Sequence, residues 1–304
     1  MRHIVLINPA SGKSDKTAVL TEQAKKDFAA HGEEFVVLRT EYAGHAREIA
    51  RRLAETGEDT VIYACGGDGT LGEVADGIAN CPTCALAPVP VGTGNDFIKC
   101  FGDGAQAVFS SFSALIAGDT VPIDLLRVGG RICLNIASAG LDAAVCARMP
   151  VYKRALPING STAYNLSLIH CFFAAVKNRY AFEIDGVYYE PSDYVFAVAA
   201  NGRYYGGGYK AAPHADMRDG LIDFIRIPSM PRARMLSMVS SYRRGEHFEK
   251  YPFITLERCR SVRYIAPDPI PMNLDGEVIA MQNPLVTIEP LALRLVVPQG
   301  VNMP

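Results

Sequence analysis

The first part of the chain alternates short apolar runs with segments in which apolar residues recur every three or four positions. The apolar runs cover residues 3–7, 34–39, 60–65 and 85–91. Such runs, separated by amphipathic segments, are typical of parallel strands joined by helices. Residues 1–122 are therefore predicted to form an α/β domain with a parallel sheet.

Apolar stripes mark the predicted helices of this domain. Leu20, Ala24 and Phe28 fall on one face of the first helix. Three further stripes predict helices over residues 46–53, 71–78 and 105–117. For the helix that starts near residue 71, Thr70 is predicted to be the N-cap, and Glu73 would complete a capping box.

From residue 121 the pattern changes to short strands. Two-residue hairpin turns are predicted at Gly129-Gly130 and at Asp185-Gly186. The predicted strands cover residues 121–128, 131–137, 182–184, 187–190, 194–200, 221–227, 262–266, 272–274 and 285–289. Helices are expected over residues 163–177 and 232–244. Residues 123–304 are therefore predicted to form a mainly antiparallel β-sandwich domain, and the pattern leaves open which domain holds the last strand, 291–298.

Composition excludes several classes of protein. The 304 residues carry a formal net charge of −2, so a polyanion-binding surface is not expected and nucleic acid is not a predicted partner. No apolar stretch reaches the roughly 18 residues of a membrane-spanning helix. The apolar run at the N-terminus is too short for the core of a signal peptide. We therefore expect a cytoplasmic protein.

The eight cysteines do not form a recognisable framework. Cys65, Cys133 and Cys171 lie in apolar runs, where free cysteine behaves as a small hydrophobic residue. Cys81 and Cys84 have CxxC spacing, but no second cysteine or histidine pair lies nearby to complete a zinc site. Reduced cysteines are therefore expected.

The strongest chemical signal is a loop that follows a buried strand and leads into a helix, Gly66-Gly67-Asp68-Gly69-Thr70. Glycines allow backbone N–H groups to approach phosphate oxygens, and a helix N-terminus adds partial positive charge. The aspartate can hold a Mg²⁺-bound water or orient a nucleotide. An ordinary βα turn is the alternative interpretation, but three glycines with Asp and Thr in this context favour a phosphate site.

Two more strand ends carry glycine-containing polar loops. These are Asn8-Pro9-Ala10-Ser11-Gly12-Lys13 and Gly92-Thr93-Gly94-Asn95-Asp96. Open α/β sheets bind ligands at the carboxyl ends of their strands, so a nucleotide site is predicted at this edge. Neither loop has the GxxxxGK[ST] spacing of a P-loop. The first strand is not followed by GxGxxG, which disfavours a Rossmann dinucleotide site.

In this order and spacing, the three loops resemble the diacylglycerol kinase catalytic domain, whose superfamily also contains sphingosine and ceramide kinases and, more distantly, NAD kinases and phosphofructokinases. The resemblance extends over residues 3–290 through signatures of small bacterial lipid kinases: Gly140-Leu141-Asp142, Asn201-Gly202, Tyr205-Gly206-Gly207-Gly208, Asp216-x-x-Asp219-Gly220-Leu221-Ile222-Asp223 and Leu274-Asp275-Gly276-Glu277. It implies an ATP- and Mg²⁺-dependent kinase that transfers the γ-phosphoryl group to a lipid hydroxyl, such as that of diacylglycerol.

The resemblance also implies which residues bind ATP. They are Asn8, Pro9, Ala10, Ser11, Gly12, Thr40, Gly66, Gly67, Asp68, Gly69, Thr70, Glu73, Gly92, Thr93, Gly94 and Asn95. One departure from the family pattern is Gly72, where relatives often have Asn. An Asn side chain there could contact the nucleotide, so Gly72 is expected to loosen ATP binding.

Two metal sites are implied in the same way. Asp68, Asp96 and Asp124 would surround the catalytic Mg²⁺ and its waters. A second site would consist of Asp216, Asp219 and the carbonyl of Leu221. Oxygen ligands of this kind suit Mg²⁺ or Ca²⁺. A solvated turn is the alternative interpretation for the second group, because Asp and Gly are common turn residues.

Asp275 would be the general base on the lipid hydroxyl, with Glu277 supporting it. Phosphoryl transfer needs a carboxylate that positions the attacking hydroxyl. Asp-Gly is also an ordinary hairpin turn, which is the alternative interpretation of Asp275. Together with Asp68 at the ATP site, these residues would catalyse direct in-line transfer without a phospho-enzyme.

The resemblance places the lipid substrate at a membrane surface, with the protein peripheral to the inner membrane face. The sequence does not identify the lipid. The apolar stretch 164–173 is expected to be a core helix or a wall for acyl chains. An NAD kinase shares the Gly-Gly-Asp-Gly loop but does not account for the turn at Asp275, and a non-catalytic sensor would lack acidic residues that are present here. An exposed sheet edge could pair two subunits into a homodimer.

Overall fold

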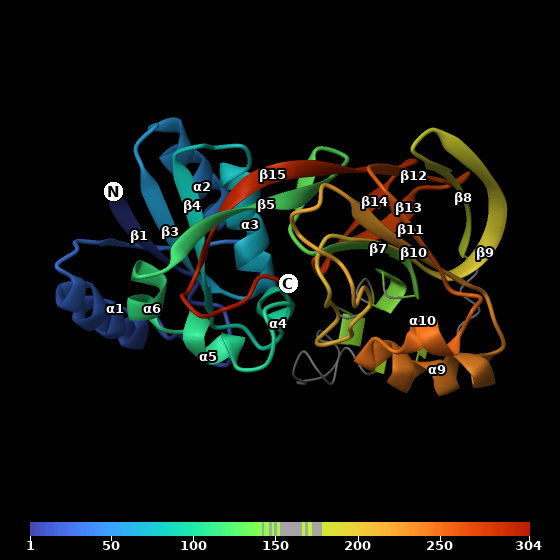
Figure 1. Ribbon diagram of the computed structural model, residues 1–304, viewed down its shortest axis with the longest axis horizontal. Coiled ribbons are helices and arrows are strands. Elements are labelled where there is room, and N and C mark those ends of the chain that lie inside the picture. The colour runs from blue at the N-terminus through green and yellow to red at the C-terminus, as the bar shows by residue number, and fades with distance from the viewer. Residues whose placement is uncertain (142, 146–147, 149–150, 153–165, 168–169, 172–177) are drawn as a thin grey trace. The chain divides into compact units, whose positions relative to one another are not determined.

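The computed structural model describes the chain except residues 142, 146–147, 149–150, 153–165, 168–169 and 172–177 (Figure 1). The described chain divides into two compact units. Unit 1 consists of Met1–Leu125, Asp216–Gly220 and Glu289–Pro304, and unit 2 consists of Leu126–Ala215 and Leu221–Ile288. The predicted helix over 163–177, the apolar stretch 164–173 and Asp142 lie largely or wholly outside the described residues.

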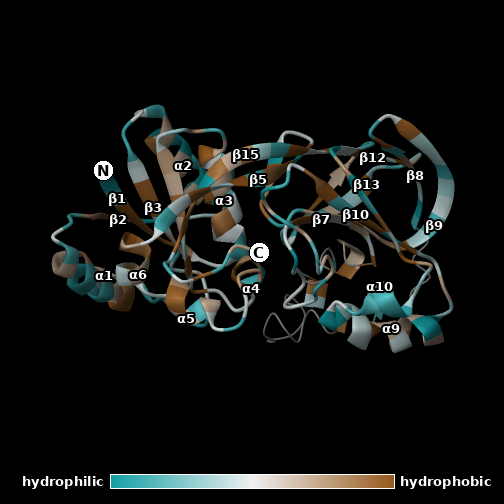
Figure 2. Ribbon diagram, in the orientation of Figure 1, coloured by the Kyte–Doolittle hydropathy of each residue, from teal (hydrophilic) through white to brown (hydrophobic). Residues whose placement is uncertain are grey.

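Unit 1 contains a parallel sheet in the order β2-β1-β3-β4-β15. The strands are β1 (Arg2–Ile7), β2 (Val36–Arg39), β3 (Thr60–Gly66), β4 (Cys84–Pro90) and β15 (Leu285–Val297). Every residue of β3 and β4 is buried, and both strands are largely hydrophobic in Figure 2. Central parallel strands need this composition because helices cover both faces of such sheets. The predicted α/β fold of the N-terminal part is confirmed.

The helices of unit 1 follow the predicted stripes. They are α1 (Thr17–His31), α2 (His45–Glu55), α3 (Asp68–Ile78), α4 (Asp96–Lys99), α5 (Ala105–Phe109) and α6 (Phe112–Ile116). As predicted, α1 buries Leu20, Ala24 and Phe28. The single helix expected over 105–117 is two short helices, because Ser111 starts a new one by accepting a hydrogen bond from the backbone N–H of Ala114 at 3.2 Å.

The predicted capping box at α3 is wrong. The helix begins at Asp68 with Gly67 as its N-cap, so Thr70 already lies inside the first turn. The Glu73 carboxylate instead accepts hydrogen bonds from the backbone N–H groups of Gly44 at 2.8 Å and Ala46 at 3.1 Å. Glu73 therefore stabilises the N-terminus of the neighbouring helix α2, where a carboxylate satisfies free N–H groups and offsets the helix dipole.

Unit 2 is a mainly antiparallel β-sandwich-like domain, as predicted. Its strand order is β14-β13-β7-β9-β8-β12-β15, and β10 pairs with both β9 and β11. The strands not yet given are β5 (Asp119–Val128), β6 (Arg131–Cys133), β7 (Ile136–Gly140), β8 (Asn178–Ile184), β9 (Val187–Ala200), β10 (Ile222–Pro228), β11 (Thr255–Cys259), β12 (Ser261–Ile265), β13 (Ile270–Leu274) and β14 (Glu277–Met281). Phe182, Phe224 and Tyr264 pack edge to face in its core, with ring centroids 5.1 to 5.7 Å apart.

Most predicted elements of unit 2 are confirmed, with changes in length and number. Both hairpin turns form, joining β5 to β6 and β8 to β9. The helix expected over 232–244 is α9 (Arg232–Arg244), and it is followed by the short α10 (His247–Lys250). Strands 187–190 and 194–200 are one strand, β9, and the last two predicted strands are also one strand, β15. β11 and β14 were not predicted.

Asp124 fastens three separate segments of unit 1. Its side chain is fully buried, and its Oδ2 and Oδ1 accept hydrogen bonds from the backbone N–H groups of Gly220 at 2.8 Å and Leu291 at 2.7 Å. Its own backbone N–H donates to the carbonyl of Met217 at 2.7 Å. Asp124 therefore helps to hold the segment Asp216–Gly220, far away in sequence, to the rest of unit 1.

Replacing Asp124 with Asn should lower the free energy of unfolding by about 3 kcal/mol, because an amide N–H₂ cannot accept one of the two buried hydrogen bonds. Chemical denaturation monitored by circular dichroism measures the change. Asp119→Asn is the control, since Asp119 lies exposed on the same strand. Equal stability of the two variants would contradict a fastening role for Asp124.

His247 is a buried histidine in the apolar part of unit 2. Its ring is fully buried and lies 4.8 Å from the ring of Tyr242 and 4.3 Å from that of Phe248, measured between centroids. Burial lowers the pKa of His247 to about 4. The unfolded chain binds a proton at His247 near its ordinary pKa, so the folded state loses stability as the pH falls from about 6.5 to about 4.

Replacing His247 with Gln should therefore weaken the pH dependence of stability. Between pH 7 and pH 5, the wild type should lose about 1–2 kcal/mol more unfolding free energy than the variant. Urea denaturation at the two pH values measures the difference. His31→Gln serves as the control because His31 is exposed, and a wild type that loses no more stability than His247→Gln would contradict the prediction.

Candidate active site

The three glycine-containing loops meet at the carboxyl ends of β1, β3 and β4 within unit 1. The backbone N–H of Asn8 donates to the carbonyl of Cys65 at 3.0 Å. The backbone N–H of Val91 donates to the carbonyl of Gly66 at 2.9 Å. These bonds continue the ladder of the sheet past the ends of the strands, so the loops after β1 and β4 are both held to the loop after β3.

Glycine is required where these loops touch. A Cβ on Gly92 would lie 2.6 Å from the Cα of Gly67, closer than real Cβ contacts occur. Gly12 has a φ of +86°, and a Cβ there would lie 2.9 Å from the carbonyl oxygen of Val91. Loops packed this closely can present backbone N–H groups to an anion without intervening side chains.

Asp68 joins the loop after β3 to the helix after β4. Its Oδ2 and Oδ1 each accept a hydrogen bond at 3.0 Å, from the backbone N–H groups of Asp96 and Phe97 respectively. Burial, and secondly the nearby charge of Asp96, raise the pKa of Asp68. Asp96 in turn forms an ion pair of 2.6 Å with Lys99. The two predicted acidic residues thus lie together, next to one cation.

Amide side chains fix the loops from both sides. The Nδ2 of Asn8 donates to the Thr70 hydroxyl at 2.9 Å, and its Oδ1 accepts from the backbone N–H of Ala10 at 3.0 Å. Asn95 has a left-handed backbone, and its Nδ2 donates to the carbonyl of Gly92 at 2.9 Å. The Oδ1 of Asn95 is buried and accepts no hydrogen bond from any part of the chain that the structure describes.

The other predicted ATP-site residues lie in the same loops or next to them. Pro9, Ala10 and Ser11 belong to the loop after β1, Gly69 to the first turn of α3, and Thr93 and Gly94 to the loop after β4. Thr40 follows β2, is buried, and donates its backbone N–H to the carbonyl of Ile7 at 3.0 Å. Glu73 lies one turn into α3 and contacts α2 as described above. Their role toward ATP stays a prediction.

The predicted metal ligands do not gather into one group. No three Asp, Glu, His or Cys side chains among the described residues are arranged to hold a metal ion. Both carboxylate oxygens of Asp124 are engaged by backbone N–H groups. Asp216 accepts from the backbone N–H of Arg218 at 3.0 Å. The assignments of Asp68, Asp96, Asp124, Asp216, Asp219 and the Leu221 carbonyl as metal ligands stay predictions.

Asp275 lies in unit 2, in the tight turn between β13 and β14. It has a φ of +48°. Its Oδ2 accepts from the backbone N–H of Leu134 at 2.6 Å and its Oδ1 from that of Ile136 at 2.9 Å. The N–H of Asn135 is shared between the two oxygens at 3.1 and 3.2 Å. Burial raises the pKa of Asp275, and the hydrogen bonds from the backbone oppose this shift.

Glu277, predicted to support Asp275, has its ion-pair partner on another strand. Its carboxylate is exposed and forms an ion pair of 2.6 Å with Arg131 on β6.

The sequence did not predict the segment that faces Asp275, residues 134–136, because this segment contributes backbone N–H groups. Asn135 in this segment donates from its side chain to the carbonyl of Tyr204, and the side chain of Asn201 donates to the carbonyl of Leu134 at 2.9 Å. The Asn201-Gly202 and Tyr205 signatures were the only sequence signals for this network.

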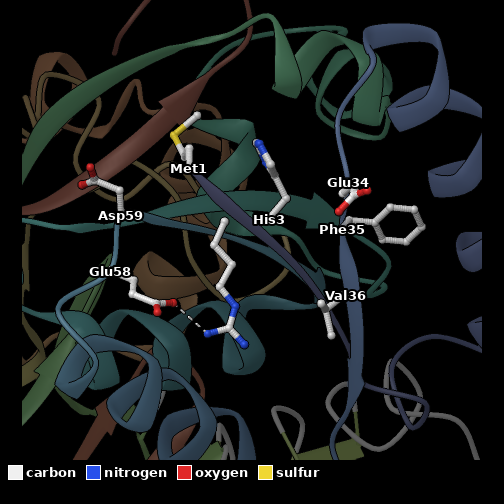
Figure 3. A pocket seen from close by; sticks show the side chains of 8 residues that line it. Met1, His3, Glu34, Phe35, Val36, Glu58 and Asp59 are labelled. Carbon is white, nitrogen blue, oxygen red and sulfur yellow. Dashed lines mark hydrogen bonds and ion pairs between the residues drawn. The ribbon is translucent and has the colours of Figure 1, made fainter.

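A separate cavity of about 500 Å³ lies at the amino ends of β1, β2 and β3 (Figure 3). It is lined by Met1, Arg2, His3, Glu34, Phe35, Val36, Glu58 and Asp59. An ion pair of 3.1 Å between Arg2 and Glu58 lies beside it. Because the glycine-containing loops follow the carboxyl ends of these strands, this cavity is not part of the candidate site.

Two further findings concern only the described residues. The cysteines among them are free thiols, with Cys84 buried and Cys81 half-buried. None of the described helices has both the length and the apolar character needed to cross a membrane.

Comparison with known proteins identifies both parts of the chain. Residues 2–128 match the diacylglycerol kinase catalytic domain, and residues 135–297 match the YegS C-terminal NAD kinase beta sandwich-like domain. A diacylglycerol kinase of Bacillus subtilis (strain 168) is 29% identical over 276 residues, which cover 90% of this chain and 88% of that protein.

Two other matches span most of the chain. The "Probable lipid kinase YegS" of Escherichia coli O9:H4 (strain HS) is 30% identical over 259 residues, covering 84% of this chain and 83% of that protein. The crystal structure of a diacylglycerol kinase from Bacillus anthracis str. Sterne aligns with a TM-score of 0.76 at 21% identity, covering 98% of this chain and 97% of that one, which shows a shared fold. The chain therefore belongs to the family of YegS-like lipid kinases, in which a diacylglycerol kinase catalytic domain precedes a β-sandwich-like domain.

Proposed function

We propose that this protein is an ATP-dependent lipid kinase that transfers the γ-phosphoryl group of ATP directly to the hydroxyl of a lipid such as diacylglycerol. The observation that carries the proposal is the meeting of three glycine-containing loops at the carboxyl ends of β1, β3 and β4, fastened by Asp68. The names of the relatives, a diacylglycerol kinase and a YegS lipid kinase, support the choice of a lipid acceptor.

The residues present fit a bound nucleotide. Gly67 and Gly92 approach each other closely, and because neither has a Cβ, their backbone atoms stay accessible to a ligand. The N-terminus of α3, at Asp68, adds the partial positive charge that phosphate groups favour. The buried Oδ1 of Asn95 finds no donor in the described chain, and a ligand N–H or O–H would satisfy it. These features support ATP binding by the loops.

The carboxylates of Asp68 and Asp96 fit a bound Mg²⁺. Kinase sites bind Mg²⁺ through one or two carboxylates together with the substrate phosphates, so a three-carboxylate group is not required. Asp68 and Asp96 are the residues that would hold it, since their carboxylates lie close enough to raise the pKa of Asp68. Bound Mg²⁺ would neutralise developing charge on the phosphoryl oxygens.

Asp275 is the proposed acceptor of the hydroxyl proton. Three backbone N–H groups and the Cys133 thiol contact its carboxylate, so a substrate hydroxyl would bind by displacing the shared contact from Asn135 or the weak bond from the thiol. Burial raises the pKa of Asp275, which makes its carboxylate a stronger base than an exposed one. The N–H groups of Leu134 and Ile136 hold the carboxylate in one orientation.

The function is tested by incubating the protein with [γ-³²P]ATP, Mg²⁺ and a panel of acceptors in mixed micelles. The panel contains diacylglycerol, phosphatidylglycerol, a sphingoid base and an isoprenoid alcohol, with NAD as an additional acceptor. Label in one extracted lipid supports the proposal and identifies the substrate. Label in NADP would replace the lipid kinase with an NAD kinase. ATP binding without transfer to any acceptor would indicate a nucleotide sensor.

Asp275→Asn should reduce kcat by about 10²–10⁴-fold, because the amide cannot accept the hydroxyl proton. The matched control is Asp185→Asn. Asp185 also starts an Asp-Gly hairpin turn, has a φ of +46°, and accepts from the backbone N–H groups of Arg260 and Ser261. Radiometric assays and thermal unfolding of both variants separate chemistry from turn stability. If both variants lose activity in proportion to their stability, Asp275 is only a turn residue.

Gly92→Ala should lower kcat/KM for ATP by about ten- to a hundredfold, because the added Cβ pushes apart two loops that would bind the phosphates. Gly72→Ala is the control, since a Cβ there meets no atom within 4 Å in the described structure. Initial rates at varied ATP concentration measure both variants. An unchanged kcat/KM for ATP in Gly92→Ala would argue against nucleotide binding at these loops.

A further inference from the structure

Helix α9 in unit 2 carries an apolar stripe on its outer face. Its inner face is buried through Met238, Ser241 and Tyr242. On the opposite face, the side chains of Leu236 and Val239 are 60% and 39% exposed. Leucine and valine at this exposure, three residues apart on the same helical face, have no role in the core of this chain.

The stripe is flanked by positive charge. Arg232 and Arg243 lie four residues before Leu236 and four residues after Val239, so all four side chains fall at positions i, i+4, i+7 and i+11 of one helix face. Arg244 forms an ion pair of 2.7 Å with Glu246 and Arg234 lies over the ring of Phe253, so neither adds to this face, and the helix itself contains no acidic residue. An apolar stripe bordered by arginines is the pattern of helices that lie in the surface of an anionic membrane.

A short path of contacts connects this helix to Asp275 within unit 2. The Tyr242 hydroxyl on α9 is 3.0 Å from the Tyr205 hydroxyl. The carbonyl of the preceding residue, Tyr204, accepts a hydrogen bond from the side chain of Asn135. The backbone N–H of Asn135 donates to the Asp275 carboxylate at 3.1 Å. A surface bound by α9 would therefore lie against the same rigid network that orients the proposed base.

We propose that α9 docks the protein on an anionic phospholipid bilayer, with Leu236 and Val239 entering the headgroup region and Arg232 and Arg243 contacting lipid phosphates. The proposal rests on the proposed lipid kinase function, because a kinase with a bilayer-embedded substrate must work at that surface. Charge complementarity selects the anionic bilayer as the occupant: an uncharged partner would gain nothing from Arg232 and Arg243, and an acidic partner in solution would not need the apolar stripe.

The test is sedimentation of the full-length protein with vesicles of phosphatidylcholine, with and without phosphatidylglycerol. The wild type should bind only the vesicles that contain phosphatidylglycerol, and added salt should weaken the binding. Leu236→Asp should weaken vesicle binding by about tenfold. The double variant Arg232→Gln/Arg243→Gln should weaken it by more than about tenfold, because each arginine near an anionic surface contributes about fivefold.

Two matched controls come from exposed positions of the same unit. Leu256→Asp changes a leucine that is 38% exposed on β11. Arg179→Gln/Arg260→Gln removes the same charge from other exposed sites. Both controls should bind vesicles as well as the wild type does. Equal binding by the α9 variants, equal weakening by the controls, or no vesicle binding by the wild type would each overturn the proposal.

A second readout separates this proposal from the proposed function. With a short-chain diacylglycerol presented as monomers below its critical micelle concentration, the α9 variants should phosphorylate as fast as the wild type. With vesicles, they should be slower by the factor lost in binding. Vesicle binding that depends on α9, without phosphorylation of any lipid, would support docking and contradict the kinase. Equal loss of activity on monomers and vesicles would contradict a docking role.

Discussion

The candidate ATP site depends on one buried carboxylate. Asp68 extends from the end of β3 and bonds the first two backbone N–H groups of α4, so it joins the loop after β3 to the loop after β4. Hydrogen bonds to a charged group contribute about 1.5–3 kcal/mol each. This stabilisation must exceed the cost of burying Asp68 near Asp96, a cost that appears as a raised pKa. Asp68 therefore acts together with the backbone bonds between these loops to keep the glycines in close approach.

Local patterns were enough to predict strands β1 to β4 and helices α1 to α3 of unit 1, but not the short helix α4 or the division of residues 105–117 into α5 and α6. Continuous apolar runs distinguish β3 and β4 from the amphipathic helices, and burial follows from the parallel sheet. The failures came from long-range contacts. Residues 285–289 and 291–298 were predicted as two strands, yet they form one strand, β15. At Leu291, where φ is +53°, the backbone N–H donates to Asp124, a contact from far away in sequence. Glu73 likewise caps a different helix from the one predicted.

The candidate site was predictable only in part for the same reason. Glycine-rich loops can be recognised from their residues, because a positive φ or the close approach of two backbone segments favours glycine at particular positions. Asp275 could not be distinguished from a turn residue by its neighbours, since Asp185 has the same Asp-Gly sequence, nearly the same φ and similar bonds to backbone N–H groups. The two aspartates differ in the segments to which their carboxylates are hydrogen-bonded. Asp185 fastens the exposed start of β12, whereas Asp275 is oriented by a segment whose Asn135 also contacts Tyr204.

The proposed docking through α9 is expected to be weak, and the reason is the charge of the product. The product of a lipid kinase carries about 1.5–2 more negative charges than its substrate, and a basic surface attracts it. Strong docking would therefore retain the product and slow turnover. Two half-exposed apolar side chains and a few arginines provide reversible binding, comparable to a single weak membrane anchor. Because Tyr242 contacts Tyr205, such binding would act on the network of contacts that reaches the Asp275 turn.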